Sequence, residues 1–337
     1  MFWLPVVVSF LITLSLSQHA GAGSVGEAQV DSSQPTVTLR FGGDVLLGGY
    51  YESATAGRPA YAFEGFTALS DADVAMVNFE HPVTRQGKKV PKPYNFRMSP
   101  EYLPALTAAG IDIVSLANNH IFDYGKEGLF DTISYLDSIG ILHVGAGRDR
   151  EEAYRPVVLN IRGQKIGFLA YYGGGESPGA RRRSAGVARR ELPLIRDQID
   201  TLRRRDNVGF IVVNLHWGTE KALSPDASQR AFAHAVIDAG ADAVIGHHPH
   251  VLQGIERYRN GVIAYSLGNL LFGGNSRDRY DTGILEIRLE PDGPRYRFMP
   301  VRIDAWRASL LGGADSARVV QSVRRLSRMF PATIFTN

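Results

Sequence analysis

Residues whose side chains can bind metal ions follow six short apolar segments of the chain, at the point where each segment ends. In chain order these residues are Asp44; Glu80 and His81; Asn118, Asn119 and His120; His216 and Glu220; His247, His248 and His250; and Asn269. Carboxylate oxygens and imidazole nitrogens suit Mn, Fe or Zn. In two-metal sites a carboxylate bridges cations about 3.5–4 Å apart, and a shared hydroxide acts as the nucleophile. The set therefore predicts a site for two divalent metal ions.

Each of these groups also has a structural interpretation when it is taken alone. Asp44 after two glycines is typical of a turn, and Asn119 with its neighbours is typical of a helix N-cap. A single histidine such as His216 is usually a hydrogen-bonded structural residue. The run from His247 to His250 is more distinctive, because hydrophobic packing gives no reason to place three imidazoles within four residues. The metal interpretation depends on these groups meeting at one place.

The absence of cysteine narrows the possible chemistry further. None of the 337 residues is a cysteine, which excludes disulfides, thiolate metal ligands and a cysteine nucleophile. Ser266 precedes Leu267-Gly268 and so lacks the G-x-S-x-G pattern of a serine hydrolase. His143 and His234 lie in apolar surroundings and are interpreted as core or helix residues. Any bound metal must therefore be held by nitrogen and oxygen atoms.

The segments that precede the polar groups read as strands of an α/β domain. They are rich in Val, Ile, Leu and Phe with little polar alternation, which is typical of strands buried on both faces. The predicted strands are Val37–Phe41, Val74–Phe79, Ile113–Leu116, Lys165–Tyr171, Phe210–Leu215, Ala243–Ile245, Val262–Leu267, Ile284–Leu289 and Tyr296–Val301. The predicted helices are Pro100–Ala109, Gly128–Ile139, Leu192–Arg204 and Gln229–Ala239, with a closing helix around Val319, Val323 and Leu326. Because ligand sites gather beyond the carboxyl ends of the strands in such sheets, the polar groups should share one rim.

The N-terminal segment predicts the destination of the protein. Residues 2–16 are apolar and are followed by Ala20-Gly21-Ala22, which is typical of a secretory signal peptide over residues 1–22. No Lys or Arg precedes the apolar run, so an uncleaved membrane anchor is the alternative. We expect a flexible leader over 23–35, one domain over 36–305, and a closing helix and tail over 306–337. The domain would then be secreted, periplasmic or on the outer cell surface.

Arginine is concentrated in one segment of a chain whose net charge is only +3. Residues 181–205 contain nine Arg and three acidic residues, a local charge of +6. The segment could capture an anionic polymer, or it could be a solvated loop and helix face. The candidates for polymer binding are Arg181, Arg182, Arg183, Arg189 and Arg190. The small net charge of the whole chain does not predict nucleic-acid binding.

Six ordered motifs in the chain resemble those of the bacterial capsule synthesis protein CapA family, also called the poly-γ-glutamate biosynthesis family. They are FGGDVLLGG (41–49), VNFEHPVT (77–84), GIDIVSLANNHIFDYG (110–125), NLHWGTE (214–220), GADAVIGHHPHVLQG (240–254) and IAYSLGNLLF (263–272). The resemblance covers about Thr36 to Leu289. It implies a four-layer α/β/β/α sandwich of the calcineurin-like metallophosphatase group, with mixed sheets and a dinuclear metal centre on its rim.

The resemblance also implies a role for each polar residue. The implied metal ligands are Asp44, Glu80 as the bridging carboxylate, Asn119, His216, His248 and His250. His120 would stabilise the leaving group or transition state, and Asp123 would orient it. Residues that would support the ligands, or replace one of them, are Asn118, Glu220, His247 and Asn269. Two departures from the family pattern put phosphatase activity in doubt: Asp44-Val45-Leu46 lacks a D-x-H pair, and His81 stands where a small hydroxyl residue is common.

The function implied is capsule or poly-γ-glutamate assembly, transport or release by a metal-dependent hydrolase. Its substrate would be an anionic polymer or a phosphoester, and membrane-bound capsule synthase subunits are possible partners. Two alternatives remain at this point. One is a non-catalytic component that binds the polymer or the synthase, and the other is a general periplasmic metallophosphoesterase.

Overall fold

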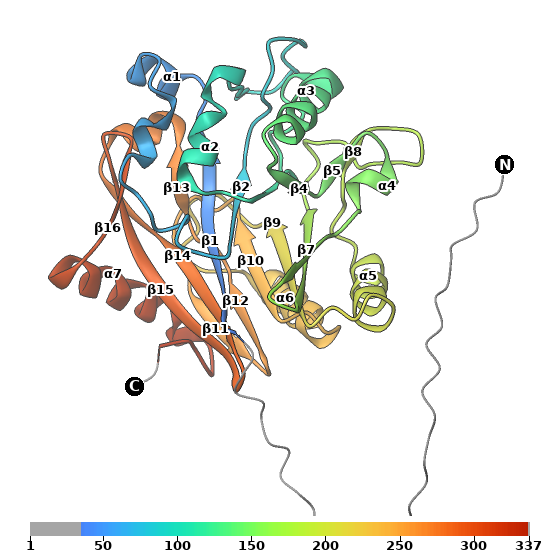
Figure 1. Cartoon of the computed structure of the whole chain (residues 1–337), viewed down its shortest axis with the longest axis vertical. Helices are drawn as coiled ribbons and strands as arrows, with labels where there is room; N and C mark the ends of the chain where they lie inside the picture. Colours follow the sequence, from blue (N-terminus) through green and yellow to red (C-terminus); the bar gives the residue numbers. More distant parts are fainter. Residues whose placement is uncertain (1–34, 336–337) are drawn as a thin grey trace, which may run out of the picture.

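Two mixed β-sheets pack face to face at the centre of the molecule (Figure 1). The computed structural model describes residues 35–335, so the predicted signal peptide and most of the predicted leader lie outside the described residues. Within 35–335, no helix has the length and apolar character that crossing a bilayer requires.

The first sheet carries β1 (Val37–Leu46) near its centre. Its strand order is β16 (Arg307–Leu310), β15 (Gly293–Asp304), β14 (Tyr280–Glu290), β1, β2 (Val74–Phe79), β3 (Ile113–Ser115) and β4 (Leu142–Val144), with β13 (Asn269–Phe272) also paired to β1. From β1 to β4 the strands are parallel, whereas β14, β15 and β16 are antiparallel. Strands β14 and β15 form a hairpin, because they pair up to Glu290 and Gly293 and enclose only Pro291-Asp292.

The second sheet is parallel at its centre and antiparallel at both edges. Its order is β11 (Ile255–Tyr258), β12 (Gly261–Ala264), β10 (Ala243–His247), β9 (Phe210–His216), β7 (Gln164–Tyr172) and β6 (Val157–Ile161). A short ladder joins β5 (Ala146–Gly147) to β8 (Gly186–Val187).

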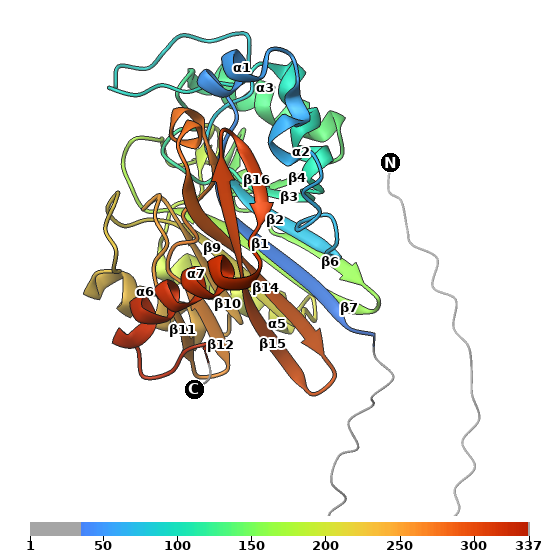
Figure 2. The same ribbon diagram turned by 90° about the vertical axis from the view of Figure 1, so that its left-hand side faces the viewer.

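Helices cover the outer faces of both sheets, so the predicted α/β/β/α sandwich with mixed sheets is confirmed. Helices α5 (Leu192–Arg204) and α6 (Ala227–Asp238) pack on the second sheet. On the first sheet lie α2 (Pro104–Ala109), α3 (Gly125–Ser138) and α7 (Gly313–Leu326). Figure 2 shows α7 lying across the long strands near the C-terminus. Two short helices, α1 (Tyr50–Thr55) and α4 (Arg150–Ala153), lie in connecting segments.

The alternation of side chains along β9 explains how the fold aims a histidine at the rim. Ile211, Val213 and Leu215 belong to the core that contains α5 and α6. Side chains point to opposite faces at successive positions. Asn214 and His216 therefore point to the other face, where Asn214 Nδ2 lies 3.3 Å from the sulfur of Met76 on the first sheet.

Two of the differences between the predicted and the observed strands affect the site. The first strand continues past Phe41 to Leu46, with an irregularity in its pairing between Phe41 and Asp44, so Asp44 lies within a strand and the turn interpretation is wrong. The strand predicted from Val262 to Leu267 ends at Ala264 as β12, and a further strand, β13, follows at Asn269 in the other sheet. This crossing pairs Asn269 with Asp44.

The buried carboxylate of Glu256, on β11, contacts helix α6 and the residue that follows β12. It is 2% exposed, accepts a hydrogen bond from the hydroxyl of Tyr265 at 2.7 Å, and lies 3.0 Å from Nε2 of His234 on α6. Replacing Glu256 by alanine leaves these groups without a partner, so we expect the free energy of unfolding to fall by about 3 kcal/mol. Urea denaturation measures this loss, with Glu151→Ala as an exposed control. Equal midpoints for the two variants would contradict a structural role for Glu256.

Candidate metal centre

Two carboxylates from the first sheet form the base of the site. Asp44 lies on β1 and Glu80 follows β2 directly, and both are completely buried. The amide of Asn78 joins them: its Nδ2 donates to Asp44 Oδ1 at 2.8 Å and to Glu80 Oε2 at 3.1 Å. The two-residue spacing of Asn78 and Glu80 directs both side chains to the same side of the extended chain.

The second sheet contributes imidazoles that face these carboxylates. His216 ends β9, and its Nε2 lies 3.5 Å from Glu80 Oε1. His250 lies in the loop after β10, with Nδ1 at 3.0 Å from Asp44 Oδ2 and Nε2 at 3.8 Å from Glu80 Oε1. The two sheets thus bring together residues that are 206 positions apart in the chain (250 − 44).

The loop that carries His248 and His250 has an unusual backbone. These residues have φ angles of 97° and 57°, in the left-handed region that non-glycine residues rarely adopt. Such conformations cost free energy and cluster at functional sites, where the surrounding structure holds them. The strain in this loop is consistent with a requirement to aim the two imidazoles.

Three overlapping sets of three side chains could each hold a metal ion. Within each set, the three ligand atoms lie within 4.8 Å of one another. The sets are Glu80, His216 and His248; Glu220, His248 and His250; and Asp44, Glu80 and His250. His248 belongs to two of them. His247 belongs to none; its Nδ1 lies 3.4 Å from Asp44 Oδ1 and its Nε2 lies 3.4 Å from Asn214 Oδ1. The geometry therefore favours His248 over His247 as a ligand.

The electrostatics of the site fit a bound cation. Burial alone would raise the pKa of Asp44, but hydrogen bonds to His247 and His250 hold it well below its usual range. Burial, followed by the nearby charge of Asp44, raises the pKa of Glu80 well above its usual range. Within the described residues, Glu80 Oε1 and His248 Nδ1 are buried without a hydrogen-bond partner. A divalent cation would satisfy such groups, whose desolvation is otherwise costly.

Asn269 gives His250 a defined orientation. Its Oδ1 lies 2.9 Å from Nδ1 of His250, which also faces Asp44 Oδ2. Two oxygen acceptors at Nδ1 place the ring proton there and leave Nε2 free as a ligand atom, as outer partners of metal-binding histidines commonly do. Asn269 therefore supports a ligand in this structure.

The loop after β3 brings an Asp–His pair to the site. Asn118 Oδ1 accepts hydrogen bonds from the backbone of His120 at 3.0 Å and of Ile121 at 2.9 Å and so closes a turn. The helix N-cap interpretation is wrong, because the next helix, α3, begins only at Gly125 and has Tyr124 as its N-cap. Asn119 Oδ1 lies 2.9 Å from His216 Nε2. Asp123 Oδ2 lies 2.8 Å from His120 Nδ1, the contact through which Asp123 would orient that ring.

Two residues of this site were not among the predicted site residues. Asn78 could have been found from its two-residue spacing to Glu80. Lys92 lies in a loop without periodic pattern, and its Nζ donates to the carbonyl oxygen of Asn119 at 2.8 Å and forms an ion pair with Asp123. The charge of Lys92 thus helps to hold the Asp–His pair.

His81, the second departure from the family pattern, has a structural role. The backbone amide of Leu47 donates to its Nε2 at 2.9 Å, and burial lowers the pKa of His81 to about 3. The ring is therefore a neutral acceptor that fixes the chain beyond β1.

The five predicted polymer-binding arginines divide into two groups. Arg181, Arg182 and Arg183 are exposed. Arg189 donates to the carbonyl oxygens of Gly174 and Ser177, and Arg190 is half-buried. The five residues therefore do not share one environment, and polymer binding remains a prediction.

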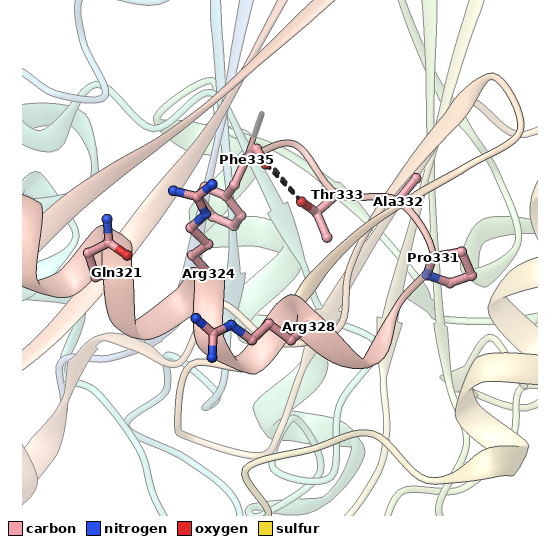
Figure 3. A pocket seen from close by; sticks show the side chains of 7 residues that line it. All are labelled: Gln321, Arg324, Arg328, Pro331, Ala332, Thr333 and Phe335. Carbon is pink, nitrogen blue, oxygen red and sulfur yellow. Dashed lines mark hydrogen bonds between the residues drawn. The ribbon is translucent and has the colours of Figure 1, made fainter. Parts of the chain in front are cut away.

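A hollow of about 490 Å³ beside α7 lies outside this centre (Figure 3). Its lining is Gln321, Arg324, Arg328, Pro331, Ala332, Thr333 and Phe335. These residues include no imidazole or carboxylate side chain, so the hollow does not offer the ligands of a metal site.

Comparisons with known proteins agree with the resemblance seen in the sequence. Capsule biosynthesis protein CapA of Bacillus anthracis is 31% identical over 304 residues, covering 86% of this chain and 72% of that protein. The PGA biosynthesis protein CapA of Bacillus subtilis is 30% identical over 278 residues, covering 80% and 73%.

The fold is similar to that of a solved putative 5′-nucleotidase from Staphylococcus aureus. The TM-score is 0.50 and the sequence identity 14%, and the match covers 86% of this chain and 58% of that one. This likeness concerns the metallophosphatase-like fold. The model of the family described as bacterial capsule synthesis protein PGA_cap matches residues 38–274. Because this match covers most of the chain, the protein belongs to the bacterial capsule synthesis protein PGA_cap family.

Proposed function

We propose that the protein is a metal-dependent hydrolase that acts in the assembly, transport or release of a capsule polymer such as poly-γ-glutamate. The observation that carries this proposal is the buried Glu80 Oε1, which has no hydrogen-bond partner and lies 3.5 Å from Nε2 of His216 and 3.8 Å from Nε2 of His250. The names of the two CapA relatives supply the polymer class.

Two cations, of Mn, Fe or Zn, would be held by the buried carboxylates and the facing imidazoles. The residues proposed to hold them are Asp44, Glu80, Asn119, His216, His248 and His250. When bound, the cations would supply Lewis acidity and a nucleophile derived from water. Their identity and number belong to the proposal.

Residues that do not bind the cations would stabilise the charge that develops on the substrate during hydrolysis. His120 would donate a hydrogen bond or a proton to the charge that develops on the substrate oxygen or leaving group. Asp123 fixes the ring of His120 at 2.8 Å, and Lys92 holds Asp123 by an ion pair. An export signal or anchor in residues 1–22 would place this activity outside the cytoplasmic membrane, where capsule synthase subunits are candidate partners.

A substrate screen tests the hydrolase proposal. The full-length protein, loaded with Mn or Zn, is incubated with γ-glutamyl peptides and with phosphoesters, including nucleotides. We expect γ-glutamyl amide hydrolysis that falls by at least about 1,000-fold in Asp44→Asn, because a ligand carboxylate is lost. Glu151→Gln, at an exposed side chain, is the matched control.

The other outcomes of the screen separate the alternatives. Cleavage of phosphoesters alone would indicate a general metallophosphoesterase. A folded, metal-loaded protein that cleaves neither class would contradict the proposal.

The three exposed arginines at 181–183 favour a second candidate, a non-catalytic component that binds the polymer or the synthase. This candidate predicts that neutralising all three lowers capsule output in a capsule-forming host, whereas Asp44→Asn leaves it unchanged. The hydrolase proposal predicts that Asp44→Asn changes capsule output or chain length.

A further inference from the structure

A pocket of about 260 Å³ adjoins the candidate metal centre. His216 and His248 belong to its wall, so the pocket and the metal centre share two side chains. Its volume lies below the roughly 300–1,000 Å³ of pockets that take drug-sized ligands, and it suits one residue of a polymer. The pocket therefore defines what part of a substrate can lie next to the metal ligands.

Arg190 is the cation of this pocket. Its guanidinium lies 4.8 Å from the ring centroid of Phe232 and 5.7 Å from that of Trp217, and the residue is half-buried. Among the described residues, no hydrogen bond or ion pair engages this guanidinium, and the absent side chain of Gly173 leaves room beside its Nε. A rigid guanidinium fork held between aromatic rings is suited to bind a planar carboxylate.

Two carboxylates line the same pocket. Glu176 is exposed and accepts a hydrogen bond from the hydroxyl of Tyr172. Asp226 caps α6, where its Oδ1 accepts from the backbone of Gln229 at 2.8 Å. With one cation and two anions, the pocket disfavours a segment of polyanion, because like charges would approach one another. It favours a group that carries an ammonium as well as a carboxylate.

We propose that this pocket binds the amino-terminal residue of a γ-linked glutamyl chain, with its α-carboxylate on Arg190 and its α-ammonium beside Glu176 and Asp226. This proposal rests on the proposed function. In a γ-linked chain only the amino-terminal residue carries both groups on one carbon, and its γ-amide extends away from them toward the wall of His216 and His248. Internal residues carry a carboxylate without an ammonium.

The proposal gives the hydrolase a direction along the polymer. Water would add to the γ-carbonyl carbon of the end residue, and the bond from that carbon to the amide nitrogen would break. The products are glutamate, with a new γ-carboxylate, and a chain shortened by one residue whose freed nitrogen takes up the proton. The enzyme would thus remove residues from the amino end.

Binding to the metal-free protein tests the pocket separately from catalysis. The full-length protein is treated with EDTA, so that no turnover consumes the probe, and is titrated calorimetrically with tri-γ-glutamate and with its N-acetylated form. We expect the free amino end to bind at least 10-fold more tightly than the acetylated one. Arg190→Gln should weaken binding of the free form at least 10-fold, whereas Arg204→Gln, an exposed arginine on α5, should leave it unchanged.

One more variant and one more probe complete the test. Glu176→Gln, at an exposed position, should reduce the preference for the free amino end even if Arg190→Gln fails to fold. Equal binding of the free and acetylated probes would overturn the proposal, as would wild-type affinity in Arg190→Gln. Inorganic phosphate that binds as tightly as the tripeptide and competes with it would indicate a general anion site and would also overturn it. Because metal is absent throughout, these results do not depend on whether the loaded protein is a hydrolase.

Discussion

Replacing Glu80 by glutamine is expected to stabilise the metal-free protein by about 1–2 kcal/mol and to weaken divalent-metal binding by at least about 100-fold. The gain arises because Glu80 Oε1 is buried without a hydrogen-bond partner, and the Glu80 carboxylate offers a ligand atom within 4.8 Å of those of Asp44 and His250. A neutral amide removes a second buried negative charge beside Asp44. The loss arises because the same charge would bind the cation.

Urea denaturation in EDTA and calorimetric titration with Mn measure the two effects. Glu286→Gln is the matched control, because Glu286 is 3% exposed and its carboxylate is paired with Arg40 and Arg297. That variant should lose stability and keep its metal affinity. If Glu80→Gln instead loses stability in EDTA as Glu286→Gln does, the charge of Glu80 does not require a cation.

Gly43→Ala is expected to destabilise the protein by about 3 kcal/mol or more and to abolish metal binding in the fraction that folds. A Cβ at Gly43 would overlap the backbone carbonyl oxygen of Gly268, which also accepts a hydrogen bond from Asp44 N at 2.8 Å. Backbone atoms at this crossing cannot move aside without separating β1 from β13. Asp44 would then lose its position opposite Asn269.

The neighbouring glycine provides a matched control for this prediction. A Cβ at Gly42 would meet Cδ2 of Leu270 at 2.9 Å and Cγ1 of Val77 at 3.1 Å, which are ends of side chains that can shift. Gly42→Ala should therefore cost less and keep the metal affinity. Thermal denaturation and metal titration of both variants measure the difference, and equal losses would contradict the role assigned to the close approach at Gly43.

The strand ends were predictable because parallel strands leave a strong local signal. Apolar runs such as Phe210–Leu215 are bounded by residues that cannot be buried without partners, and their carboxyl ends must share one rim. Side chains alternate between the two faces of a strand, so the sequence alone predicts that His216 points away from the face that carries Ile211, Val213 and Leu215.

The crossing between the two sheets could not be predicted in the same way. Residues 262–267 form one apolar run interrupted only by Ser266, so their pattern does not show that β12 ends at Ala264. Nor does it show that the next strand, β13, belongs to the other sheet. The continuation of β1 through Gly42 and Gly43 accompanies its pairing with β2 and β13, which are tertiary contacts. Arg190 likewise seemed part of a charged surface, because its contacts with Trp217 and Phe232 join segments that are distant in sequence.

The metal content of the purified protein tests the central proposal most directly. The full-length protein is equilibrated with Mn, Fe or Zn, freed of unbound metal, and measured by elemental analysis beside an Asp44→Ala, His250→Ala double variant and Glu286→Gln. We predict about two metal ions per chain in the wild type and in Glu286→Gln, and fewer than one in the double variant. A wild-type protein that is fully folded and yet retains no metal would contradict the proposal.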